Sequence, residues 1–237
     1  MHVTIKGDVS EKGVITMLDI DIFQKRLKSF PSNYMKNFNY VWNWKISKEN
    51  GVNSILSDKT LFETHFRLSK ILNRWQTYRN GDNTDSIGTL KQSLRNIAEA
   101  YYLIKDFSLL EFDKVPIEPL AEIWHELGRV KEAEGKMNEQ GIYSIIAVCK
   151  PLLLIWGQTL AFDSRVRKNM DKRYQIPKYQ GKWVFREWID GMNQISKTLN
   201  ESPKCIEAIE EEAYRRYGPN SFIPYGRFLD IYYFEGR

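Results

Sequence analysis

The sequence predicts an all-α fold of about eight to ten helices. We expect these helices to form two lobes. Three observations predict the all-α fold. Apolar residues recur at three- and four-residue intervals, as they do along one face of a helix. They make up 42% of the 237 residues, which is enough to bury a sizeable core. Helix start and stop signals, such as Ser202-Pro203 and Gly218-Pro219, separate the periodic stretches.

The first half of the chain is expected to form four helices after an irregular start. Residues 1–20 hold short apolar patches broken by Gly7 and Gly13, which indicates a short strand-like N-terminus. Helical periodicity follows over residues 21–30, 33–46, 61–79 and 86–107, with a polar loop at 80–85.

The second half is expected to add an acidic helix, a central apolar segment and three further elements. Residues 118–140 are rich in Glu and predict a solvated helical face, and residues 141–170 contain the longest apolar run. Beyond it the pattern predicts helices over 182–199 and 203–217, and a short closing helix or strand at the C-terminus. The spacing of Arg227 and Asp230 allows a local ion pair, or lets Arg227 reach another part of the site.

Two breaks in the pattern are candidate lobe boundaries. One is the polar loop at 80–86, and the other is the proline-containing stretch at 115–119. We therefore expect an N-terminal helical lobe over residues 1–115 and a second lobe over 116–237. One continuous domain is the alternative.

Composition excludes several classes of site. The chain has two cysteines and three histidines with no metal-binding spacing, so we expect no metal and no cofactor. The Rossmann, P-loop and nucleophile-elbow motifs are absent. The net charge of +5 is mildly basic and favours an anionic partner.

The sequence also predicts the cellular compartment of the protein. Isolated cysteines fit a reducing environment, and the first residues do not resemble a secretory signal, so we expect a cytoplasmic protein. The uninterrupted apolar piece Leu152–Trp156 is far too short to span a bilayer, so no membrane partner is expected.

Lys150 and Asp163 are the strongest functional candidates, because each charge stands within or beside the apolar run. Burying such a charge costs several kcal/mol unless the group is paired or used. A Lys in apolar surroundings is more readily a neutral nucleophile, and a nearby Asp can stabilise positive charge or transfer a proton. The alternative is structural: Asp163 caps the helix that begins at Ser164, and Lys150 pairs with it or extends to solvent.

A basic segment with interleaved aromatic residues follows Asp163. Positive side chains for phosphates beside flat rings for bases are typical of a nucleic-acid surface. The alternative is a solvated helix and loop whose aromatic residues belong to the core. The candidate phosphate-binding residues are Arg165, Arg167, Lys168, Lys172, Arg173 and Lys178.

The segment from the apolar run through Asp163-Ser164-Arg165-Val166 resembles the core of helix-hairpin-helix DNA glycosylases of the 8-oxoguanine type, and of divergent bacterial proteins that share their fold. The resemblance implies a two-lobed helical fold, with Lys150 attacking the sugar C1′ and Asp163 at the start of the next helix. The family's Gly-rich hairpin before the Lys is absent, so the resemblance bears on the fold more than on catalysis.

Two main functions therefore stay open. The first is a DNA-associated, glycosylase-like protein that excises a base with Lys150 and Asp163, which would make it a hydrolase in DNA repair. The second is a non-enzymatic helical module that binds nucleic acid or another protein, in which both residues are structural. A small-molecule enzyme is a third possibility that no motif supports.

Overall fold

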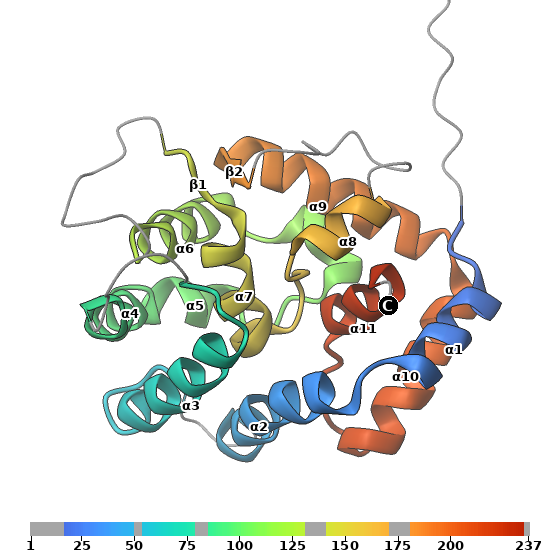
Figure 1. Ribbon diagram of the computed structural model, residues 1–237, viewed down its shortest axis with the longest axis horizontal. Helices are drawn as coiled ribbons and strands as arrows, with labels where there is room; N and C mark the ends of the chain where they lie inside the picture. The colour runs from blue at the N-terminus through green and yellow to red at the C-terminus, as the bar shows by residue number, and fades with distance from the viewer. Residues whose placement is uncertain (1–16, 50–53, 79–84, 131–140, 171–180, 235–237) are drawn as a thin grey trace, which may run out of the picture.

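The structure, a computed structural model, describes residues 17–49, 54–78, 85–130, 141–170 and 181–234. These residues are mostly helical, which confirms the predicted all-α class (Figure 1). The elements in order are α1 (Ile20–Ser29), α2 (Ser32–Glu49), α3 (Leu61–Arg74), α4 (Asp85–Asn96), α5 (Ala98–Ile104), the 3-10 helix η1 (Leu109–Lys114), α6 (Ile117–Arg129), β1 (Tyr143–Ser144), α7 (Ile145–Trp156), α8 (Ser164–Met170), β2 (Lys182–Trp183), α9 (Phe185–Asn200), α10 (Pro203–Tyr217) and α11 (Tyr225–Tyr233).

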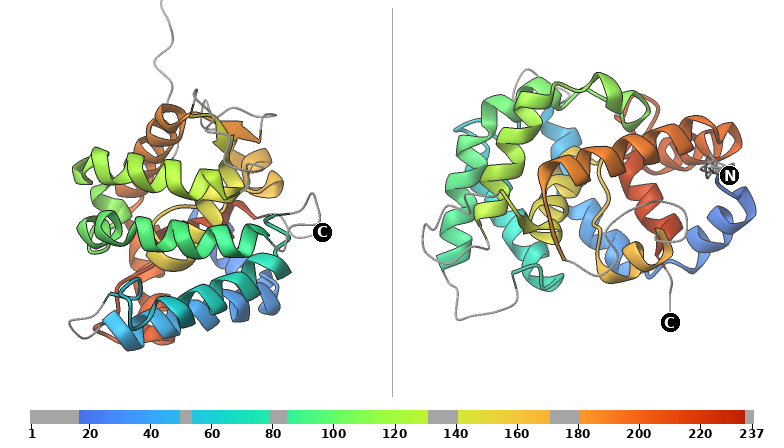
Figure 2. Two further views of the ribbon diagram at one scale, coloured as in Figure 1. Left: turned by 90° about the vertical axis from the view of Figure 1, so that its left-hand side faces the viewer. Right: turned by 90° about the horizontal axis from the view of Figure 1, so that it is seen from above.

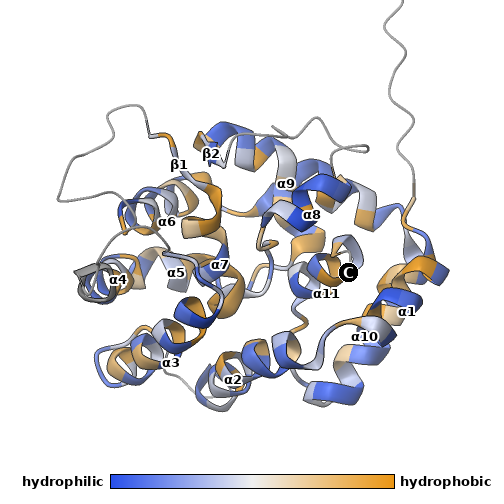
Figure 3. Ribbon diagram, viewed as in Figure 1, coloured by the Kyte–Doolittle hydropathy of each residue, from blue (hydrophilic) through white to orange (hydrophobic). Residues whose placement is uncertain are grey.

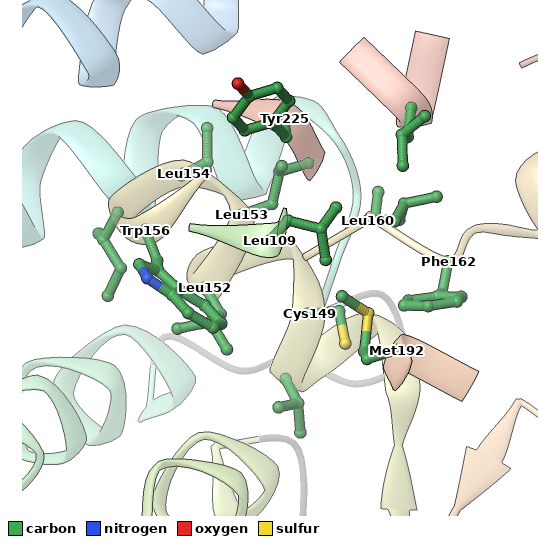
Figure 4. Close-up of a cluster of buried hydrophobic side chains, with 14 of the residues drawn as sticks. Leu109, Cys149, Leu152, Leu153, Leu154, Trp156, Leu160, Phe162, Met192 and Tyr225 are labelled. Atoms are coloured by element: carbon green, nitrogen blue, oxygen red, sulfur yellow. The ribbon is translucent and has the colours of Figure 1, made fainter. Parts of the chain in front are cut away.

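Helix α7 is the centre of the fold. It contacts α2 and α3 on one side and α6 on another, and every residue of it except Ile146 is buried. Its apolar colour contrasts with the mixed colours of the outer helices in Figure 3. Figure 4 shows the leucines and Trp156 of α7 among side chains from η1, α9 and α11. A helix buried on all sides must be apolar all round, which explains the long apolar run in the sequence.

The end of α7 is fixed by a glycine and a buried glutamine. Gly157 adopts the left-handed conformation (φ 78°), and a side chain there would overlap Trp42 and Pro224. In the next residue, Gln158 Oε1 accepts a hydrogen bond from the Leu109 amide, and Nε2 donates to the Ile223 carbonyl, both at 2.8 Å. These bonds hold the connection that leads from α7 to Asp163.

One hydrophobic core includes residues from both sides of position 115. Helix α5 packs on α6, and α2 and α3 pack on α7, so elements of the two expected lobes share contacts. The proposed division at residue 115 and its one-domain alternative both stay predictions.

The structure modifies several local predictions. The helix expected over 86–107 is interrupted at Ile97, and both Ile97 and Tyr101 are fully buried in the core, as expected. The helix expected from 182 begins at Phe185, because Lys182 and Trp183 instead form β2, which pairs antiparallel with β1. The closing segment is helical. The expected strand-like N-terminus falls mainly on residues 1–16, which lie outside the described residues.

The predicted start and stop of α10 are confirmed with one change. Pro203 is its first residue, and Gly218 follows its last. Ser202 occupies the N-cap position, but its hydroxyl donates to the Thr198 carbonyl and accepts from the Leu18 amide instead of capping the helix. None of the described helices is long and apolar enough to cross a membrane.

Candidate functional site

A cavity of about 280 Å³ brings Lys150 and Asp163 to the same site. We call it the Lys150 cavity. Its wall comes from segments far apart in the sequence: the ends of α1 and α3, the start of α2, the middle of α7, the start of α8, and α11. Its lining residues are Phe30, Tyr34, Arg74, Trp75, Gln76, Lys150, Ala161, Asp163, Ser164, Arg165, Arg227, Asp230 and Phe234.

Lys150 reaches this cavity from the central helix. Only 9% of the residue is exposed, and its Nζ donates a hydrogen bond to the backbone carbonyl of Trp75 at 3.1 Å. Trp75 is the C-cap of α3, and Gln76 after it is left-handed (φ 54°). The amides of Gln76 and Thr77 bond back to the carbonyls of Asn73 and Leu72, which is a Schellman ending. This ending places the Trp75 carbonyl within reach of Lys150.

Asp163 reaches the cavity from the position immediately before α8. Its Oδ1 accepts hydrogen bonds from the amides of Arg165 and Val166, both at 3.0 Å, so it caps the helix as the structural interpretation expected. Both bonds are made by one oxygen, which leaves Oδ2 outside the cap. The preceding residue, Phe162, is also left-handed (φ 48°), with its ring buried against Trp183. Non-glycine residues rarely adopt this conformation, and here two of them flank one cavity.

Asp230 adds a second carboxylate to the cavity. It is 4% exposed; Oδ1 accepts from the Ala161 amide at 2.9 Å, and Oδ2 accepts from Arg227 at 2.8 Å. Burial raises the pKa of Asp230 to about 6, opposed by the positive charge of Arg227 and helped by the negative charge of nearby Asp163. The Ala161 amide and Lys150 also lower this pKa. A carboxyl that titrates near neutral pH is suited to proton transfer.

Arg227 is almost fully buried, at 2% exposure. Besides its ion pair with Asp230, it donates to the Tyr34 carbonyl at 3.2 Å and lies over the rings of Phe30 and Phe38. Burial lowers its pKa, and the charge of Asp230 opposes that change. From the sequence we expected Arg227 either to form an ion pair with Asp230 or to extend into the site. In the structure it forms the ion pair and also lines the Lys150 cavity.

Aromatic rings form one side of the cavity. The ring of Phe234 lies 5.1 Å from that of Phe30 and 5.7 Å from that of Tyr34, and the Arg165 guanidinium lies over Phe234. Among the charged lining residues, the four basic ones are Arg74, Lys150, Arg165 and Arg227, against two acidic ones, Asp163 and Asp230. Flat rings beside an excess of positive charge suit a base attached to a phosphate chain.

The predicted phosphate-binding residues are only partly brought together. Arg165 lines the cavity, Lys168 is exposed but does not, and Arg167 is half-buried, with a pKa lowered by burial. The predictions for Lys172, Arg173 and Lys178 lie outside the described residues. The N-terminus of α8 does not offer the Arg165 and Val166 amides to a phosphate, because both already donate to Asp163.

Sequence reasoning missed Arg74, Trp75 and Asp230 as members of the site. The contact between Lys150 and Trp75 joins residues 75 positions apart, and that between Ala161 and Asp230 joins residues 69 apart. Local sequence patterns cannot predict contacts between residues so far apart in the chain. The spacing of Arg227 and Asp230 did indicate a possible ion pair. Within the described part of the chain, no three His, Cys, Asp or Glu side chains form a candidate metal site.

Comparisons of the chain with family models, with curated proteins and with solved structures find no match.

Proposed function

We propose that this protein has a DNA glycosylase-like fold and excises a base from DNA in the Lys150 cavity. One observation carries the proposal: Lys150 and Asp163, singled out in the sequence for this chemistry, line the same cavity together with aromatic and basic side chains. Because a base inside a duplex is inaccessible, the target nucleotide would be turned out of the stack and into the cavity.

The proposed reaction uses the neutral amine of Lys150, which forms when its ammonium group releases a proton to water. Its lone pair forms a bond to C1′ of the sugar, and the bond from C1′ to the base nitrogen breaks, with its electron pair leaving on the base. The base gains one proton as the amine loses one. Opening of the sugar ring then gives an imine between Lys150 and C1′, which water hydrolyses. Asp163 would stabilise positive charge at the sugar through its carboxylate.

The remaining lining residues have binding roles in this proposal. The Phe30, Tyr34 and Phe234 rings would contact the base, and Arg74 and Arg165 would bind the flanking phosphates. The two cysteines, Cys149 and Cys205, are buried free thiols, which fits the cytoplasm as the place of this activity.

Imine trapping tests the nucleophile directly. Wild-type protein is mixed with DNA duplexes that carry uracil, 8-oxoguanine, hypoxanthine or an abasic site, and borohydride is added to reduce any imine to a stable amine. We expect a covalent protein–DNA adduct that Lys150→Gln abolishes, with peptide mapping to Lys150. The exposed Lys204→Gln variant, on α10, should retain the adduct.

A matched pair of caps tests Asp163. Asp19 caps α1 through Oδ1 bonds to the Asp21 and Ile22 amides, so it has the same geometry as Asp163 but does not line the cavity. Asn is as good an N-cap as Asp, so Asp163→Asn and Asp19→Asn should both fold normally. We expect only Asp163→Asn to lose base release. Full activity in Lys150→Gln, or no adduct and no base release from any of these duplexes, overturns the proposal.

A second function, binding without catalysis, is favoured by a specific observation. Lys150 bonds to the Trp75 carbonyl and Asp163 caps α8, so each already has a structural contact. In that case DNA binding would fall with rising salt and no adduct or base release would be seen. Absence of nucleic-acid binding at low salt would leave a protein partner.

A further inference from the structure

A second basic surface lies between α2 and α3, away from the segment that the sequence marked for nucleic-acid binding. The two helices run side by side (Figures 1 and 2). Between Ser32 and Lys48, α2 contains no acidic residue, and its outer side carries Lys36, Asn39, Asn43 and Ser47. These side chains border a groove of about 520 Å³ together with Tyr40, Trp44 and Arg67.

Helix α3 adds three basic residues, Arg67, Lys70 and Arg74, at spacings that place them on one side of the helix. We call Lys36, Lys48, Arg67, Lys70 and Arg74 the basic seam. All five lie on α2 or α3, and the nearby acidic residue Glu63 pairs with Arg67 at 2.6 Å.

Aromatic rings hold several cations of the seam in place. The Arg67 guanidinium lies 4.5 Å from the centre of the Tyr40 ring and 4.8 Å from that of Trp44. Lys70 lies over Tyr40 and Lys48 over Trp44. Since these side chains are already ordered against the rings, binding an anion loses less conformational entropy than it would with mobile side chains.

The seam leads to the Lys150 cavity. Arg74 donates to the Asn37 side chain at 3.1 Å and also lines the cavity, as does Tyr34 at the start of α2. From Tyr34 to Ser47, α2 extends for about 20 Å at 1.5 Å per residue. That length corresponds to about six base-pair steps along the axis of B-form DNA, at a rise of 3.4 Å each.

We propose that the basic seam binds the sugar-phosphate backbone of the DNA strand whose nucleotide enters the Lys150 cavity. This inference rests on DNA as the partner in the proposed function, but it does not depend on the chemistry at Lys150. The lysines and arginines neutralise phosphates, and the asparagine amides donate hydrogen bonds to phosphate oxygens.

The salt dependence of binding tests the seam. The probe is a DNA duplex with a stable tetrahydrofuran abasic analogue, which cannot be cleaved by base excision. Lys36→Gln/Lys70→Gln removes two seam charges, and Lys25→Gln/Lys204→Gln removes two exposed charges on α1 and α10. We expect the slope of log affinity against log salt to shrink by about 2 in the seam variant and to stay unchanged in the control.

The outcomes separate this inference from the proposed function. Equal slopes for the two double variants, or no binding of the duplex by wild type at low salt, overturn the seam. If the seam variant lowers the slope yet the wild type forms no borohydride adduct, the seam stands and base excision falls. If Lys150 is trapped while the seam variant binds like wild type, base excision stands and the seam falls.

Discussion

Two buried lysines occupy opposite kinds of surroundings in this molecule. Lys45 on α2 is 4% exposed; its Nζ lies 2.6 Å from Glu49 and is covered by the rings of Trp42 and Phe222. Lys150 on α7 is 9% exposed, bonds to a backbone carbonyl and lines a cavity that also holds two carboxylates. Burial alone therefore does not distinguish a structural lysine from a candidate catalytic one.

The difference lies in what surrounds the ammonium group. Glu49 bonds to Lys45 through one oxygen and accepts from the Tyr101 hydroxyl through the other. Burial lowers the pKa of Lys45, which Glu49 opposes, and burial raises the pKa of Tyr101. This network links α2 to α5, and Glu49 is the partner of both the Lys45 ammonium and the Tyr101 hydroxyl. The Lys150 cavity instead has space for a further molecule, which makes it the candidate site.

The largest expected effect is on the Lys45 network. Glu49→Ala leaves a buried ammonium without its carboxylate, so the free energy of unfolding should fall by about 3–5 kcal/mol. Urea denaturation measures it. The control is Glu63→Ala, which breaks an equally short i,i+4 pair with Arg67 that is more exposed, at 23% and 37%. That pair should contribute less than about 1 kcal/mol. Similar losses in the two variants would contradict a structural role specific to Lys45.

A smaller effect should appear in the pH dependence at the cavity. The pKa of Asp230 is about 6 when folded against 3.8 in the unfolded chain, so the folded protein binds this proton more tightly. Its contribution to stability is present below pH 3.8 and is lost as pH rises to about 6. The shift corresponds to about 3 kcal/mol at 1.36 kcal/mol per unit.

Comparing unfolding at pH 4 and pH 7 measures this contribution. Wild type should lose stability over that interval relative to Asp230→Asn, which cannot titrate at this position. The groups that set the pKa of Asp230 are Arg227, Asp163, Lys150 and the Ala161 amide. Asp113→Asn, at an exposed position on η1, should keep the wild-type profile. Parallel profiles for wild type and Asp230→Asn would show that burial does not raise this pKa.

Much of the fold could be predicted from local sequence. Apolar periodicity and helix start and stop residues predicted the helical class, the apolar α7 and the ends of α10, because each depends on residues within a few turns. The pairing of Tyr143 with Trp183 could not be predicted, because it joins residues 40 positions apart. The break at Ile97 has no marker in the local apolar pattern.

The site shows the same division. Lys150 and Asp163 were visible as charges in an apolar setting, and they line one cavity. Lys45 was overlooked, although it continues the spacing of Phe38, Val41 and Trp42 on the buried face of α2. Its partner Glu49 lies one turn further on, so an ion pair at helical spacing was a readable signal. Trp75 came from a distant segment and carried no such signal, whereas Asp230 lies three residues after Arg227, a spacing that allowed an ion pair.

The smallest expected effect on stability is at Lys150 itself. Lys150→Met keeps a long side chain in α7 and removes one hydrogen bond to the Trp75 carbonyl. It also removes a buried charge, so the free energy of unfolding should change by no more than about 1 kcal/mol. Urea denaturation beside Glu49→Ala makes the comparison direct. A loss as large as that of Glu49→Ala would mean that Lys150, like Lys45, holds the core together, and the cavity would lose its candidate nucleophile. A near-neutral change, together with loss of the borohydride adduct, would separate the role of Lys150 from the stability of the fold.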